Sequence, residues 1–156
     1  MELKRATVPA HPDRPASPRA LPLLPELMGH ETVLIMLDEV RPRRVLARAL
    51  DRFGYAVLQA PDTAQAQHIA RLNQQIQVLL IDLITSEMTG AQLALWFRAE
   101  FPSMQVVVAS TSLTDLHSLL GRSQQITLLA KPYTPLDVIR LFRRVLPPSP
   151  EKKPRS

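Results

Sequence analysis

The sequence lacks several features that would assign it to large classes of proteins. None of its 156 residues is cysteine, which excludes a disulfide framework and a thiolate metal site and favours a reducing compartment. No apolar run approaches the roughly 18 residues of a membrane span. Lys4 and Arg5 near the N-terminus precede no apolar segment of the kind that a secretory signal contains. We therefore expect a cytoplasmic protein with no membrane partner.

A concentrated basic patch is also lacking, although the net charge is +5. Residues 1–30 hold four basic and three acidic side chains, residues 31–146 hold twelve and ten, and residues 147–156 hold three and one. The positive charge is therefore spread thinly along the chain. A nucleic-acid-binding surface needs basic residues gathered on one face, so we expect no nucleic acid partner.

Proline is abundant at the two ends of the chain. Six of the fifteen prolines lie in residues 1–30 and four lie in residues 147–156. Because proline removes backbone donors and breaks helices, both ends are predicted to be disordered arms. Residues 21–28 are apolar enough to rest on the domain surface. The predicted domain itself spans residues 31–146.

The segment between the arms alternates between two kinds of pattern. Short apolar runs predict strands, and runs with a 3.6-residue apolar period predict helices. The predicted strands are residues 32–37, 55–59, 76–81, 105–109 and 126–130, and the predicted helices are residues 41–53, 63–72, 90–101, 113–120 and a segment that follows Pro135. In the first helix we expect Val45, Ala49 and Phe53 on the buried face. Five strand–helix units predict an α/β fold, a doubly wound five-stranded parallel sheet flanked by five helices.

Polar residues follow four of the five predicted strands. Asp38, Asp82, Ser110 and Lys131 stand at these positions. In a doubly wound sheet, ligands bind outside the carboxyl ends of the strands. A carboxylate or an ammonium group at a buried strand end is costly unless something pairs with it. Two carboxylates, a hydroxyl and an ammonium group at one edge predict a site for a cation and a phosphoryl group.

These residues, in this order and at separations of 44, 28 and 21 positions, resemble the receiver (CheY-like) domain of two-component response regulators. The resemblance implies that Asp82 is the phosphoryl acceptor and that the donor is a histidine kinase or a phosphotransfer protein. It also implies a Mg²⁺ site formed by Asp38, Asp82 and the carbonyl of Ile84. Lys131 would neutralise phosphoryl charge and Ser110 would hydrogen-bond the phosphoryl group. With no output domain expected, the protein would signal by contact with a downstream protein.

Three positions depart from the family pattern. Leu37 replaces the first of two adjacent acids, Thr85-Ser86 replaces a Met-Pro pair, and Leu128 replaces an aromatic switch residue. These departures favour an alternative, a degenerate pseudo-receiver that acts as a phosphorylation-independent interaction module. A small enzyme is disfavoured because the chain lacks a Gly-rich phosphate loop and carries Ile84 where a phosphatase-like site would have a second acid. We therefore expect a protein that is not an enzyme.

Overall fold

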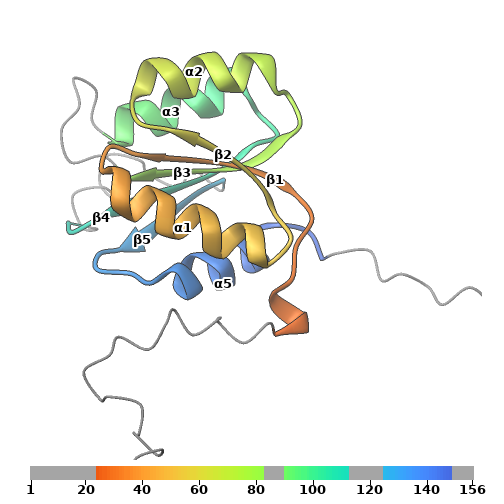
Figure 1. Cartoon of the computed structure of the whole chain (residues 1–156). Coiled ribbons are helices and arrows are strands. Elements are labelled where there is room, and N and C mark those ends of the chain that lie inside the picture. The colour runs from red at the N-terminus through yellow and green to blue at the C-terminus, as the bar shows by residue number, and fades with distance from the viewer. Residues whose placement is uncertain (1–23, 83–89, 113–124, 149–156) are drawn as a thin grey trace, which may run out of the picture.

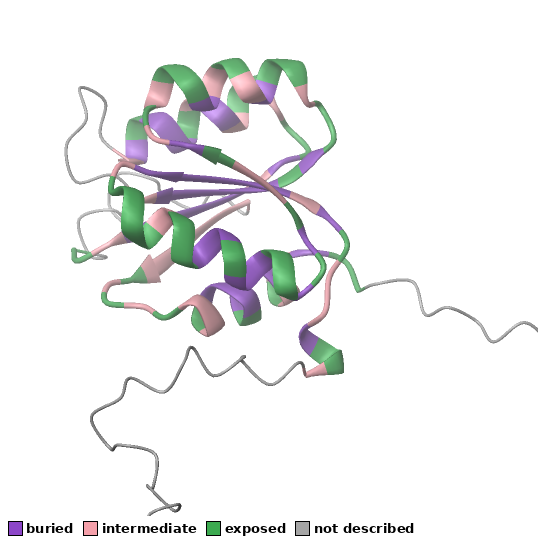
Figure 2. Cartoon of the chain, viewed as in Figure 1, coloured by how far each residue is buried: buried purple, intermediate pink, exposed green. Residues whose placement is uncertain are grey.

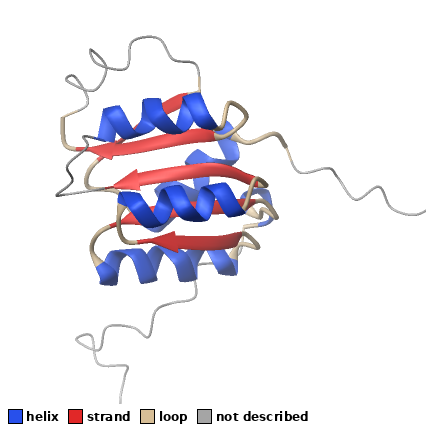
Figure 3. Cartoon of the chain, turned by 90° about the horizontal axis from the view of Figure 1, so that it is seen from above, coloured by secondary structure: helices blue, strands red, loops and turns tan. Residues whose placement is uncertain are grey.

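The computed structural model contains one parallel β-sheet, and it describes residues 24–82, 90–112 and 125–148. The strands are β1 (Thr32–Leu37), β2 (Ala56–Ala60), β3 (Ile76–Asp82), β4 (Gln105–Ser110) and β5 (Ile126–Ala130). They are ordered β2-β1-β3-β4-β5, and each neighbouring pair is parallel. Figure 3 shows the strands side by side with the helices packed across them. The predicted sheet is confirmed, with boundaries that differ by one residue at β2, β3 and β4.

Helices cover both faces of the sheet in the described part of the chain. They are α1 (Val40–Arg52), α2 (Thr63–Leu72), α3 (Gly90–Glu100) and α5 (Pro135–Val145), and a short 3₁₀ helix, η2 (Pro25–Leu27), precedes β1. Helices α1 and α5 lie on one face and α2 and α3 on the other (Figure 1). This arrangement confirms the doubly wound fold. The fourth predicted helix, residues 113–120, lies outside the described residues.

The core has two parts, one on each face of the sheet. One part is formed with α1 and α5 around Leu50 and Phe142, and the other with α2 and α3 around Leu79 and Phe97. Strands β1 and β3 are buried along almost their whole length, as Figure 2 shows. Strands covered on both faces carry continuous apolar runs, which explains why these two segments were recognisable in the sequence.

Two of the helices begin at capping residues that the sequence shows. Asp62 is the N-cap of α2, where its side chain accepts a hydrogen bond of 2.8 Å from the backbone amide of Gln65. Thr134 and Asp137 form a capping box at the start of α5. Both caps satisfy backbone amides that lack a partner within the helix. The capping box also fixes where the chain turns from β5 into α5, directly beside the strand end that carries Lys131.

A glycine ends α1 and docks the chain that precedes β1. Gly54 has φ of 98°, a conformation that other residues adopt at a cost. A Cβ atom at this position would lie 2.2 Å from the carbonyl oxygen of Gly29, and the amide of Gly29 donates to Phe53. Only glycine allows this close approach. Residues 24–30, which precede the predicted start of the domain at residue 31, pack on the domain through Leu27, which is buried against the core.

A cluster of polar groups is buried at the amino edge of the sheet. Glu31 is 2% exposed and forms an ion pair with Arg143 of α5. The Arg143 guanidinium also lies over the ring of Tyr55, 5.6 Å from its centroid, and donates to the carbonyl of Met28 at 3.3 Å. We call Glu31, Tyr55 and Arg143 the amino-edge cluster. It ties the chain that enters β1 to the last helix.

One prediction for α1 is wrong. Ala49 and Phe53 are buried as predicted, but Val45 is 52% exposed. The buried stripe passes instead through Leu46 and Leu50, which recur with Phe53 at helical spacing. Val45 lies at the border of this stripe, where the helix faces the carboxyl edge of the sheet instead of the core. Arg41, Arg44, Arg48 and Arg52 lie on the exposed face of α1.

The helices of the described residues are all short. The longest of them, α1, has 13 residues, and none is long and apolar enough to cross a membrane.

Candidate functional site

Asp82 is the last residue of β3, at the carboxyl edge of the sheet. The strand order reverses direction between β1 and β3, and ligands of doubly wound folds bind at this point. Residues 78–81 that lead to Asp82 are buried, whereas its own side chain is 14% exposed. The buried strand thus holds a carboxylate at the surface of the site and fixes its position.

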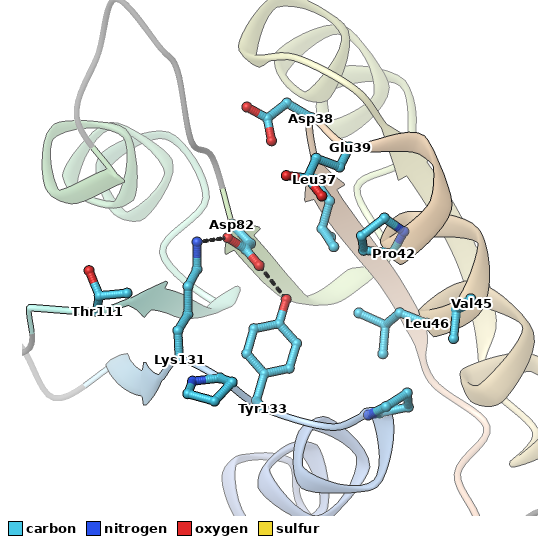
Figure 4. Close-up of a pocket in the computed structure, with 12 residues that line it drawn as sticks. Leu37, Asp38, Glu39, Pro42, Val45, Leu46, Asp82, Thr111, Lys131 and Tyr133 are labelled. Carbon is cyan, nitrogen blue, oxygen red and sulfur yellow. Dashed lines mark hydrogen bonds and ion pairs between the residues drawn. The ribbon is translucent and has the colours of Figure 1, made fainter.

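Two side chains from the segment after β5 contact the Asp82 carboxylate, as Figure 4 shows. The ammonium group of Lys131 pairs with Oδ1, and the hydroxyl of Tyr133 donates a hydrogen bond to Oδ2. Both carboxylate oxygens therefore have a partner, which offsets the cost of their partial burial. We call Asp82, Lys131 and Tyr133 the carboxyl-edge cluster.

Tyr133 acts only as a donor in this arrangement. Burial raises the pKa of its hydroxyl, and the hydrogen bond to Asp82 and the negative charge of that carboxylate raise it further. All three causes disfavour the ionised phenolate, because burial removes it from water, the hydrogen bond needs the proton, and ionisation would place a second negative charge beside the first. Tyr133 is therefore protonated at neutral pH and supplies its proton to the contact with Asp82.

A cavity of about 520 Å³ opens beside Asp82. Asp38 and Glu39 line it from the β1–α1 connection, and Leu37 lines it from the end of β1. In Figure 4 Asp38 lies just after the end of β1 and Asp82 at the end of the neighbouring strand β3. Mg²⁺ in proteins takes oxygen ligands and commonly one or two carboxylates, so these side chains are of the kind that the ion binds.

The described residues supply two of the three predicted metal ligands. Asp38 and Asp82 line one cavity, whereas Ile84 lies outside the described residues. No group of three or more histidine, cysteine or acidic side chains that could hold a metal occurs in the described ranges. Leu37 is 3% exposed, so an apolar side chain fills the position from which another acid would act. Such a site would depend on water for most of its other ligands.

Thr111 lines the cavity together with the predicted site residues Asp38, Asp82 and Lys131. Ser110 is the residue directly before Thr111 in the chain. Ser110 ends β4, and its hydroxyl accepts a hydrogen bond of 3.0 Å from the amide of Ser112. The backbone of Ser110 pairs with the start of the Lys131 segment, since its carbonyl accepts from the Lys131 amide at 3.0 Å. The role of Ser110 towards a phosphoryl group stays a prediction.

Much of the remaining lining of the cavity is apolar. Helix α1 contributes Pro42, Val45 and Leu46, Pro132 comes from the segment between β5 and α5, and Pro135 begins α5. Val45 and the nearby Val40 are half-exposed. The polar strand ends thus lie at one end of a groove whose sides are apolar and come from α1 and from the start of α5.

Two contacts at the site were not predicted from the sequence. Arg43 of α1 donates a hydrogen bond of 2.8 Å to the carbonyl of Leu37, which holds the end of β1 against the helix. The second is the hydrogen bond from the hydroxyl of Tyr133 to Asp82. A tyrosine two positions after a lysine at a strand end is the one signal that could have suggested a second donor to the carboxylate.

Several known proteins are similar to this chain in sequence. No family model matches the chain. The two-component response regulator ORR3 of rice, in both the indica and japonica subspecies, is 30% identical over 127 residues, which cover 79% of this chain and 95% of that protein. The chain belongs to the two-component response regulators. The PhoB phosphate regulon regulatory protein of Pseudomonas aeruginosa is 26% identical over 125 residues, and the matched region spans 53% of that regulator's length.

Solved structures identify the fold of this response regulator as that of the receiver domain. The Vibrio cholerae chemotaxis protein CheY4 has a TM-score of 0.64 at 22% identity, with 76% of this chain and all of that chain covered. The receiver domain of the hybrid histidine kinase CckA has a TM-score of 0.61 at 27% identity, with 74% and 99% covered. Together with the rice relative, these similarities place the chain in two-component signalling.

Proposed function

We propose that this receiver domain accepts a phosphoryl group on Asp82 from a histidine kinase or a phosphotransfer protein and signals by protein contact. The observation that carries the proposal is the Asp82 carboxylate at the end of β3, paired with Lys131 from the end of β5 beside a cavity. In a receiver fold this is where two-component chemistry would need a nucleophile and a cation. The proposal places the protein in the cytoplasm and assigns it no metabolic enzyme activity.

The proposed transfer is a displacement at phosphorus. One oxygen of Asp82 attacks the phosphorus atom of a phosphohistidine, the bond between phosphorus and nitrogen breaks, and its electron pair returns to the imidazole ring. An aspartyl phosphate forms on Asp82. Lys131 supports the reaction because its ammonium group lies at the carboxylate and would offset the negative charge that the phosphoryl group brings.

A Mg²⁺ ion would be held by Asp38 and Asp82, with the carbonyl of Ile84 as a further predicted ligand. When bound, the ion would reduce the repulsion between the phosphoryl oxygens and the two carboxylates. The residues of the chain itself position Asp82 at the end of a rigid strand and hold it against Lys131. The apolar sides of the groove, lined by Pro42 and Val45, would receive the protein that delivers the phosphoryl group.

Three observations favour the alternative, a pseudo-receiver that works by contact alone. Leu37 is buried where an acid would strengthen the metal site, and the hydroxyl of Tyr133 occupies an oxygen of Asp82. Leu128, at the aromatic switch position, packs partly buried against the core and has no ring to reorient. Under this alternative the role of Asp82 would be structural: it would form the ion pair with Lys131 and accept the hydrogen bond from Tyr133.

Phosphoryl transfer from a small donor separates the two functions. The full chain is incubated with acetyl phosphate and millimolar Mg²⁺, and its intact mass is followed over time. We expect the mass of one phosphoryl group to appear on the wild-type chain and to be absent from Asp82→Asn. Retention of the unmodified mass in the wild type would exclude the acceptor function and leave the contact-only alternative.

A further inference from the structure

Both oxygens of Asp82 are engaged before any phosphoryl donor arrives. Lys131 pairs with Oδ1 and Tyr133 donates to Oδ2. A carboxylate oxygen that attacks phosphorus must present a lone pair to the incoming group. Each oxygen can accept more than one hydrogen bond, but a donor held against it stabilises its charge and occupies the space beside it. The two contacts thus bear directly on how readily Asp82 reacts.

The two partners of Asp82 differ in what they do during transfer. Lys131 carries a full positive charge, which interacts favourably with the carboxylate and more strongly with the phosphoryl group that is added. Tyr133 is neutral, and its hydrogen bond is strongest when the carboxylate oxygen bears full negative charge. Formation of the aspartyl phosphate removes part of that charge, so the bond weakens as the reaction proceeds. An interaction that is stronger in the ground state than in the transition state slows a reaction.

The fold holds the Tyr133 ring in position. Its ring packs partly buried against the core formed with α1 and α5, and its side chain lines the same cavity as Asp82. Prolines stand on either side of it in the chain, Pro132 directly before it and Pro135 at the first turn of α5. The capping box of Thr134 and Asp137 fixes the next residues of the chain. The hydroxyl is therefore presented to Asp82 by a constrained segment.

We propose that Tyr133 is a positioning residue that restrains Asp82 through its hydroxyl and slows phosphoryl acceptance. This inference rests on the proposed function, since it describes how the same carboxylate is controlled. Because Tyr133 also lines the apolar groove between α1 and α5, a protein that occupies the groove would contact the restraining side chain itself.

Tyr133→Phe tests the restraint because it removes only the hydroxyl. With acetyl phosphate and Mg²⁺ we expect the variant to acquire the phosphoryl group about tenfold faster than the wild type, which corresponds to about 1.4 kcal/mol of the barrier. Tyr133→Met, which also lacks a hydroxyl, should show the same acceleration and guards against a packing effect of the ring. The chain offers a matched control, since the other of its two tyrosines, Tyr55, is buried at the opposite edge of the sheet. Tyr55→Phe should leave the rate unchanged.

A second measurement detects the contact without any phosphorylation. A hydroxyl proton that is bonded to a partly buried carboxylate exchanges slowly with water and gives a downfield proton NMR signal. We expect such a signal in the wild-type chain and in Tyr55→Phe, and its loss in both Tyr133→Phe and Asp82→Ala. Persistence of the signal in Asp82→Ala would show that the hydroxyl has another partner and would overturn the inference.

The outcomes separate this inference from the proposed function. A wild-type chain that accepts the phosphoryl group at the same rate as Tyr133→Phe, or faster, overturns the restraint and leaves the acceptor function standing. Failure of both chains to accept the group overturns both proposals. Uptake by Tyr133→Phe alone, with none in the wild type, overturns the acceptor function of the wild-type chain and shows that the Tyr133 hydroxyl is what blocks Asp82.

Discussion

The sheet carries a cluster of a carboxylate, a cation and a tyrosine at each of its two edges. The amino-edge cluster contains Glu31, and the carboxyl-edge cluster contains Asp82. In the first, the carboxylate is 2% exposed and its arginine 11%; in the second, the carboxylate is 14% exposed and its lysine 23%. The same three kinds of side chain are thus shielded from solvent at the amino edge and lie beside a cavity at the carboxyl edge.

The difference in cation matches the difference in setting. Arginine offers a planar group with five donors and suits buried, multiply bonded pairs, and Arg143 contacts a carboxylate, a carbonyl and an aromatic ring. Lysine is a compact charge on a flexible chain and can follow an anion that is added to its partner. The comparison teaches that the amino-edge cluster holds the structure together, whereas the carboxyl-edge cluster is arranged to meet a ligand.

The largest expected effect distinguishes the two carboxylates by function. Asp82→Asn should abolish phosphoryl uptake from acetyl phosphate, because an amide is not a phosphoryl nucleophile. Glu31→Gln should retain uptake, because Glu31 lies at the opposite edge of the sheet and no part of it lines the cavity. Intact-mass measurement on both variants checks this. Loss of uptake in folded Glu31→Gln would show that the two edges are coupled.

The same comparison predicts a large effect on stability at one edge and a small effect at the other. Arg143→Met leaves Glu31 buried without its cation, so we expect the free energy of unfolding to fall by about 3–5 kcal/mol. Lys131→Met should change it by about 1 kcal/mol or less, because Asp82 is nearer to water and keeps the hydrogen bond from Tyr133. Urea unfolding followed by the fluorescence of the single tryptophan, Trp96, provides both values. Comparable losses would mean that the carboxyl-edge cluster is also structural.

The sequence predicted Asp82 and Lys131 of the carboxyl-edge cluster and no member of the amino-edge cluster. Asp82 and Lys131 could be predicted because they end continuous apolar strands, and the ends of parallel strands converge at one edge. Glu31 precedes its strand and Arg143 lies on an amphipathic helix, where a charged residue usually faces water. Their pairing depends on how far the chain before β1 packs under α5, which no local pattern encodes.

Tyr133 and Val45 illustrate two further limits. Tyr133 lies in the segment between β5 and α5, so strand alternation does not determine the direction of its side chain. Val45 is apolar and lies only one position from the buried Leu46, so periodicity alone gave two nearly equivalent stripes for α1. The packing of α1 against α5 and the sheet selects between them and leaves Val45 at the cavity.

A third test adds a carboxylate to the carboxyl edge. Leu37→Asp should tighten Mg²⁺ binding by about tenfold, since two unit charges about 4 Å apart interact by roughly 4 kcal/mol at an effective dielectric of 20 and water screens part of this. Isothermal titration calorimetry of the wild type and the variant measures the change. Leu37→Asn is the matched control, because it introduces a polar side chain without charge. Equal affinity in all three chains would show that Leu37 does not limit the metal site.

The smallest expected effect is the dependence of stability on pH that Glu31 contributes. Burial raises the pKa of this carboxyl, but hydrogen bonds from the amide of His30 and from Arg143 outweigh it, and the net shift is downward from 4.5. A carboxyl group whose pKa is lower in the folded state stabilises the fold above its unfolded pKa. This contribution is lost as the pH falls through the folded value. The ring of His30, an exposed side chain, lies 3.7 Å from Glu31. Wild-type stability should therefore fall more steeply below pH 4.5 than that of Glu31→Gln, as measured by urea unfolding at a series of pH values. Parallel curves for the two chains would show that the ionised form of Glu31 contributes nothing, and the amino edge would then be held by Arg143 and its ring and carbonyl contacts alone.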